Sequence, residues 1–109
     1  MIRMNTPVKI VHLTGILDSI QGNLLRQEIN RLVEAGHTCV LIDFCEIELM
    51  DSSGLSSLVM ALQKVRSVGG TLGLYAINDQ VRMLLELTAM DEIFKIFPKE
   101  VSPQSVIMG

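Results

Sequence analysis

The sequence predicts an α/β domain in which strands and amphipathic helices alternate along the chain. Leucine, isoleucine and valine recur at helical spacing in residues 25–33 and again in residues 55–65. Between these segments, Thr38–Asp43 is a continuous apolar run, which is typical of a central strand covered on both faces. Because helices separate the strands, we expect a mixed, mostly parallel sheet of four to five strands with the helices packed against it.

The first part of the chain is expected to form a strand, a helix and a second strand. Residues 8–14 begin with alternating apolar and polar side chains and are rich in β-branched types, so they predict a strand that Gly15 ends. The helix after it has one apolar stripe, formed by Leu25, Ile29, Leu32 and Val33. Gly36 is a natural stop for this helix, and Thr38–Asp43 is the next strand.

The second part repeats the pattern. A helix is expected over residues 53–68, followed by a strand at Thr71–Tyr75 and by a further helix that Asn78 caps and that runs through Leu87. The stripe of the first of these helices consists of Leu55, Leu58, Val59, Leu62 and Val65. The 109 residues therefore predict a single domain with its core at about 8–97, and a tail, 98–109, that either frays or lies back on the body.

Composition argues against several classes of function. A formal net charge of −3, with 19% charged residues, does not provide a surface that neutralises phosphates, so DNA and RNA are not expected partners. The longest apolar stretches are far shorter than a membrane span, and the amino terminus has no charged-then-apolar signal pattern. We therefore expect the protein in the cytoplasm.

The cysteines and histidines do not form a metal-binding pattern. Cys39 and Cys45 have no further Cys or His at ligand spacing, and His12 and His37 stand alone. We expect no metal and no cofactor, and we interpret both cysteines as small buried side chains.

The segment with residues that could carry a chemical function lies at residues 44–55, between the central strand and the second long helix. Asp51 or Ser52 can accept hydrogen bonds from the first unpaired N–H groups of that helix, so one interpretation of Ser52 is a simple cap. A hydroxyl at a helix amino terminus is also a place where a phosphate is tolerated. A phosphate beside Asp51 would repel a bound partner and would be costly to desolvate, which favours release of that partner.

Three segments resemble a known family. Leu13–Asp18, Leu49–Leu55 and Val68–Leu72 are similar to the STAS domain of bacterial anti-sigma factor antagonists, and the resemblance covers about Val8 to Phe97. In that family an Asp-Ser-Ser/Thr-Gly motif opens the second helix, and a partner anti-sigma factor that is also a serine kinase phosphorylates its first serine. The resemblance therefore implies that Ser52 is phosphorylated.

The resemblance also implies a switching cycle. The unphosphorylated protein binds the kinase and frees a sigma factor, phosphorylation reverses this, and a serine phosphatase resets the cycle. The residues expected to contact the partner are Asp18, Asp51, Ser52, Ser53, Gly54 and Ser56.

Individual residues near the motif carry further expectations. Asp18 matches a family acidic residue near the phosphorylation site, which implies that it orients Ser52 or contacts the kinase; alternatively it caps the next helix, with Gln21 reaching back. Ser53 is the second candidate for phosphorylation, and Gly54 is expected to keep the approach open. Ser56 and Ser57 are expected on the exposed side of the helix.

Three apolar positions near the motif carry expectations of their own. Ile16 departs from the family, in which many members have Glu, and this leaves the choice of partner open. Leu49 and Met50 are interpreted as anchors in the core or loop.

Catalysis by the chain itself is not expected. A serine hydrolase of the strand-turn-helix type would need a histidine after the serine, and both histidines precede Ser52. No glycine-rich loop offers a phosphate cradle for ATP, so a kinase activity would belong to a partner. The alternative function is a STAS scaffold subunit of a stress-signalling complex, or of a lipid or anion transport system.

Overall fold

The strands form one sheet of four parallel strands in the order β1-β2-β3-β4. The structure is a computed structural model that describes residues 7–103 and 106. The strands are β1 (Lys9–Leu17), β2 (Cys39–Met50), β3 (Thr71–Tyr75) and β4 (Lys95–Phe97). The predicted α/β class is confirmed, and within the described residues every strand pair is parallel where a mixed sheet was expected.

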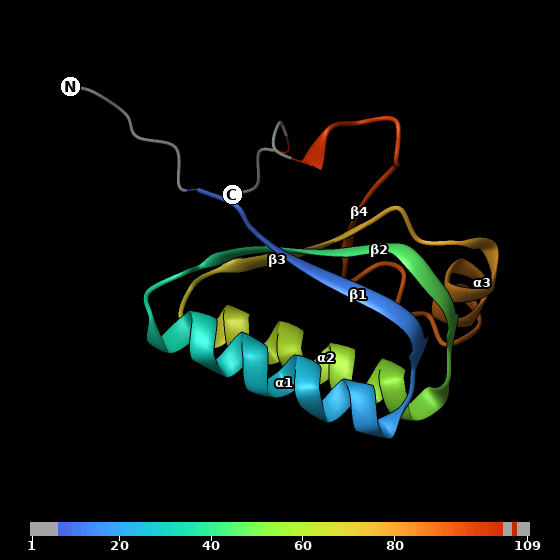
Figure 1. The fold of residues 1–109 in the computed structure, drawn as a ribbon, viewed down its shortest axis with the longest axis horizontal. Helices are drawn as coiled ribbons and strands as arrows, with labels where there is room; N and C mark the ends of the chain where they lie inside the picture. Colours follow the sequence, from blue (N-terminus) through green and yellow to red (C-terminus); the bar gives the residue numbers. More distant parts are fainter. Residues whose placement is uncertain (1–6, 104–105, 107–109) are drawn as a thin grey trace.

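The helices connect successive strands. α1 (Ser19–Glu34) and α2 (Ser52–Ser67) lie side by side against one face of the sheet, whereas α3 (Asp79–Leu87) lies beside the far end of β2 (Figure 1). The predicted stop at Gly36 is confirmed: its φ is +91°, and its N–H donates to the carbonyl of Val33. The predicted cap of α3 by Asn78 is also confirmed, because its side chain accepts from the N–H of Val81 at 2.9 Å.

The core has two parts because β2 is covered on both faces. Val40, Ile42 and Phe44 pack toward the helices, whereas Cys39 and Leu41 pack toward the opposite face. This arrangement explains the unbroken apolar run in the sequence of β2.

The face of the sheet opposite the helices is covered by the described part of the carboxyl-terminal segment. Val101 and Val106 pack there against Tyr75, whose hydroxyl donates to the carbonyls of Lys99, at 2.9 Å, and Val101, at 2.6 Å. Of the two alternatives for the tail, this part lies back on the body. Residues 104–105 and 107–109 lie outside the described residues.

The first two strands are longer than predicted. Gly15 does not end β1; with a φ of +77° it lies at an irregularity in the pairing of β1 with β2, and the strand continues to Leu17. β2 likewise continues to Met50, so residues 44–49 are strand and not loop. β4 was not predicted, because its 3 residues are too few to show a period.

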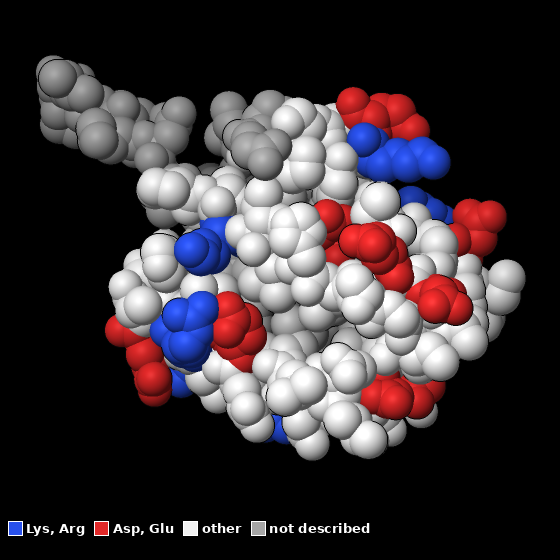
Figure 2. Space-filling view, viewed as in Figure 1, with Lys and Arg blue, Asp and Glu red and all other residues white. Residues whose placement is uncertain are grey.

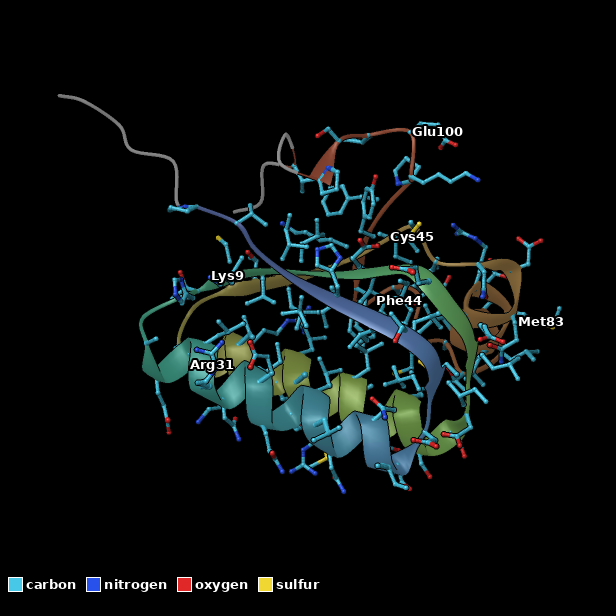
Figure 3. All side chains as sticks on the ribbon, viewed as in Figure 1. Lys9, Arg31, Phe44, Cys45, Met83 and Glu100 are labelled. Atoms are coloured by element: carbon cyan, nitrogen blue, oxygen red, sulfur yellow. The ribbon has the colours of Figure 1, made fainter. Side chains whose placement is uncertain are left out.

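The structure corrects the expectation for one of the two cysteines. Cys39 is buried as predicted, but Cys45 is exposed. Phe44 faces the helix side of β2, and Cys45 lies on the other side, near the beginning of the carboxyl-terminal segment (Figure 3).

Candidate functional site

The site is built where β1 and β2 end together. Leu17 of β1 is paired with Met50 of β2, so the next residues, Asp18 and Asp51, follow the sheet at the same edge. Asp18 begins α1 and Asp51 begins α2, each as the residue that caps its helix. The two segments singled out in the sequence are therefore brought side by side.

Asp51 is the cap of α2. Its side chain accepts from the N–H of Gly54 at 2.8 Å, and its own N–H donates to the carbonyl of Leu17 at 3.2 Å. The interpretation of Ser52 as the cap is therefore wrong. Ser52 is the first residue of α2 and is exposed, and its hydroxyl has no hydrogen-bond partner among the residues that the structure describes.

The remaining serines divide by the face of α2 on which they lie. Ser53 and Ser56 are exposed, as the partner-contact hypothesis requires. Ser57 is only 7% exposed, so its expected position on the open side is wrong. It faces α1, where a Cβ atom added at Gly22 would come within 2.7 Å of the Ser57 Cβ. Small residues at these two positions let the helices approach closely.

Gly54 is buried, so it does not keep the surface open as expected. A Cβ atom at this position would collide with the carbonyl oxygen of Leu17. The glycine is needed because the first turn of α2 is pressed against the end of β1.

Asp18 is confirmed as a helix cap, since its Oδ1 accepts from the backbone N–H of Gln21 at 2.9 Å. Its carboxyl group is half-buried at the edge that also bears Asp51. Capping therefore uses one carboxylate oxygen here, and a role in orienting Ser52 or contacting a kinase stays a prediction.

Two amide side chains at the start of α3, those of its cap Asn78 and of Gln80, hold the end of β2, and sequence reasoning missed this role. Gln80 Oε1 accepts from the N–H of Met50 at 2.8 Å, and Gln80 Nε2 donates to the carbonyl of Met50 at 2.9 Å. Asn78 Nδ2 donates to the carbonyls of Ile47, at 3.0 Å, and Glu48, at 3.1 Å. Asn78 was recognised only as a cap, and its second role depends on a tertiary contact that no local pattern shows.

Exposed apolar side chains surround the same edge. Ile16 and Leu49 are paired across β1 and β2 and are 49% and 48% exposed, and Ile20 in the first turn of α1 is 67% exposed. The expectation that Leu49 is an anchor is therefore wrong, whereas Met50 is buried as expected. The pairing of β1 with β2 is irregular here, so Leu49 is exposed although Ile47, two residues earlier, is buried, and no alternation in the sequence indicated this.

Acidic side chains are unevenly distributed over the face of the molecule drawn in Figure 2. In Figure 2, most acidic side chains of the visible face lie on the half formed by the end of β2 and by α3, where basic side chains are also present. At the other end, in the region of Lys9 and Arg31 labelled in Figure 3, basic and acidic side chains lie together, and Arg31 pairs there with Glu28. Exposed carboxylates near the site belong to Glu46, Glu48 and Asp51. A further negative charge at Ser52 would enter an acidic neighbourhood.

The fold and this motif are those of a STAS domain. The family model for the STAS domain matches residues 1–102, so the chain belongs to this family. Within the described residues, no helix is both long and apolar enough to cross a membrane.

Several proteins that are similar to this chain are named anti-sigma factor antagonists. The chain is 26% identical over 97 residues to the anti-sigma F factor antagonist of Paenibacillus polymyxa, covering 87% of this chain and 82% of that protein. It is similar to the crystal structure of an anti-sigma factor antagonist from Mycobacterium paratuberculosis, with a TM-score of 0.72 and 25% identity over 89% of this chain and 82% of that one.

The same fold also occurs in another setting. A sulfate transporter family protein from Wolinella succinogenes has a TM-score of 0.74 at 16% identity, covering 83% of this chain and 75% of that one. At this identity the likeness concerns the fold alone. The fold therefore does not decide between a regulatory and a transport-associated role, and the choice depends on the residues of the candidate site.

Proposed function

We propose that the chain is an anti-sigma factor antagonist that acts in the cytoplasm as a partner switch controlled by phosphorylation of Ser52. Unphosphorylated, it binds a serine kinase anti-sigma factor and thereby frees a sigma factor. Phosphorylated, it releases the kinase, and a serine phosphatase restores the first state. The chain is the substrate of these reactions and not the enzyme.

The observation that carries the proposal is the unpaired hydroxyl of Ser52. Asp51 takes over the capping of α2, so Ser52 Oγ is exposed without a described hydrogen-bond partner. In the transfer, this oxygen attacks the γ-phosphorus of ATP bound to the kinase, the bond from that phosphorus to ADP breaks, and a base of the kinase takes the hydroxyl proton.

Phosphorylation at this position is compatible with an intact fold. The phosphate would stand at the amino end of α2, where unpaired N–H groups and the helix dipole favour negative charge. The carboxylate of Asp51 opposes this through the repulsion of like charges, because its hydrogen bond with the N–H of Gly54 holds it one residue from the phosphate. We expect these opposing effects to leave the domain folded.

The effect on a partner is larger. The exposed side chains of Ile16, Ile20 and Leu49 offer apolar surface beside Ser52 for a partner to bury. A phosphate adds about −1.5 to −2 charges at such an interface, and burying that charge without a matched cation is costly. Release of the partner is the expected outcome.

The test is to incubate the purified protein with ATP and each candidate serine kinase anti-sigma factor, and to map added phosphate by mass spectrometry. Ser52→Ala should abolish the modification. Ser19→Ala is the matched control, because Ser19 is also exposed and also the first residue of a helix behind a capping aspartate. Phosphorylation on Ser52 should be accompanied by weaker kinase binding.

The opposite result points to the alternative role. If no candidate kinase binds or modifies the stable protein, the partner-switch proposal fails. Recovery of transporter subunits by the tagged protein, without a serine kinase, would then identify a STAS subunit of a transport system.

A further inference from the structure

The end of β2 lacks a strand neighbour on one side. β3 pairs with β2 only from Cys39 to Asp43, whereas β1 accompanies β2 as far as Met50. Met50 is only 2% exposed, and backbone polar groups of a buried strand need hydrogen-bond partners. Along this stretch, the side chains of α3 occupy the position that a neighbouring strand would take.

Gln80 satisfies Met50 as a paired strand would. Its amide both accepts from the N–H and donates to the carbonyl of this one residue, at 2.8 Å and 2.9 Å. Two antiparallel hydrogen bonds fix both the position and the orientation of the peptide groups of Met50, which a single contact would leave free to rotate. Asn78 supports the same strand two and three residues before Met50, at the carbonyls of Glu48 and Ile47.

Met50, the residue that Gln80 holds, lies directly before the phosphorylation motif. Met50 is followed by Asp51, which caps α2, and then by Ser52. On the other side, the N–H of Asp51 donates to Leu17 of β1. The peptide chain that leads to Ser52 is therefore held from α3 and from β1 at successive residues.

We infer that Gln80 is a positioning residue for Ser52: through its two hydrogen bonds to Met50 it fixes the place from which the hydroxyl meets the kinase. This inference rests on the proposed function of Ser52. Gln80 does not touch the reacting atoms, and its effect passes through the backbone of Met50 and Asp51. Phosphoryl transfer depends strongly on the alignment of the attacking oxygen, so a small displacement lowers the rate of transfer more than it lowers binding.

The inference makes α3 part of the site. α3 also presents Met83, 59% exposed, and Leu87, 78% exposed, and Figure 3 shows Met83 on the outer side of this helix. At the amino end of α3, Gln80 contacts the backbone just before the phosphorylation motif. The outer surface of α3 remains exposed.

The experiment compares Gln80→Met with wild type. Methionine keeps the length and volume of the side chain but removes both hydrogen bonds, and Gln27→Met, at an exposed position of α1, is the matched control. We expect Gln80→Met to lower kcat for phosphorylation of Ser52 by on the order of tenfold or more, with a much smaller change in KM. Hydrogen exchange should become faster at the amide of Met50 and remain unchanged in the middle of α2.

A second variant covers the case in which Gln80→Met does not fold. Gln80→Glu keeps the acceptor for the N–H of Met50 but turns a carboxylate oxygen, which cannot donate, toward the carbonyl of Met50. We therefore expect kcat to fall in this variant as well. If the kinase phosphorylates the wild type and a folded Gln80 variant has the same kcat as the wild type, the inference about Gln80 is wrong and the proposed function stands. Wild-type protein that no candidate kinase phosphorylates would overturn the proposed function and the inference with it.

Discussion

The junctions β1–α1 and β2–α2 have the same local chemistry and different surroundings. Each places an aspartate as helix cap and a serine as the first helical residue, Asp18-Ser19 and Asp51-Ser52, and both serines are exposed. At α2, however, the backbone before the serine is held by Gln80 and the third residue of the helix is pressed against Leu17. At α1 the third residue is the exposed Gln21. Both junctions thus have an exposed serine behind a capping aspartate. Only at α2 is the backbone around the serine held by a glutamine side chain on one side and by close contact with β1 on the other.

The largest expected effect follows from the close contact at Gly54. Gly54→Ala forces a methyl group against the carbonyl of Leu17, and overpacking of this kind destabilises by about 1–3 kcal/mol. At the equivalent position of α1, Gln21→Ala should change the free energy of unfolding by less than about 0.5 kcal/mol, because the side chain is exposed. Urea unfolding of the two variants measures the difference, and equal stabilities would show that the two junctions are equally tolerant.

A smaller effect is expected at the caps. Asp51→Ala and Asp18→Ala should each lower the free energy of unfolding by about 1 kcal/mol, because each leaves a helix N–H without its acceptor. Asparagine at either position keeps an acceptor oxygen and should restore most of this stability. The junctions should therefore respond alike to loss of the cap, measured again by urea unfolding.

The same caps separate the two junctions in their effect on Ser52. Asp51→Ala should shift the NMR amide signals of Ser52 and Ser53, while Asp18→Ala should leave them in place. Equal shifts from both variants would mean that Asp18 orients Ser52, as the family resemblance implies for this residue.

The fold class was predictable because periodicity reports which faces of each element are buried. The limits of the third strand, Thr71–Tyr75, were predicted as observed, since glycines precede it and the run is apolar. The ends of β1 and β2 were not, because their pairing contains irregularities that break the alternation of side chains. That break also hid the exposure of Cys45 and Leu49.

The site was predictable at the level of the motif. Asp51 and Ser52 were placed at a helix start from residue types alone, but which of them caps depends on backbone geometry. The burial of Gly54 and Ser57 comes from contacts with Leu17 and with α1 that lie far away in sequence. Gln80 had no local signal at all, because its partner Met50 is 30 residues earlier.

The smallest expected effect on the junctions comes from a change at the opposite face of the sheet. Tyr75→Phe removes the hydroxyl that binds the carbonyls of Lys99 and Val101, which should lower the free energy of unfolding by about 1 kcal/mol. Proteolysis of residues 98–103 should become faster. The NMR amide signals of Ser19 and Ser52 should not move, and a shift at Ser52 would show that the carboxyl-terminal segment communicates with the site.

The stability contributed by Tyr75 in the wild-type protein depends on pH, and the sign of this dependence follows from the pKa of its hydroxyl. Burial raises the pKa of the Tyr75 hydroxyl above its ordinary value, and the negative charge of Asp43 adds to this rise. The unfolded chain therefore loses the proton first, so the stabilisation is complete below the unfolded pKa of about 10 and is lost as the pH rises through the folded value. Since the sequence contains 1 tyrosine, tyrosinate absorbance reports this group alone. We expect a midpoint above that of the unfolded chain and, for Tyr75→Phe, a shallower loss of stability at alkaline pH; a midpoint at or below that of the unfolded chain would contradict a buried, hydrogen-bonded Tyr75.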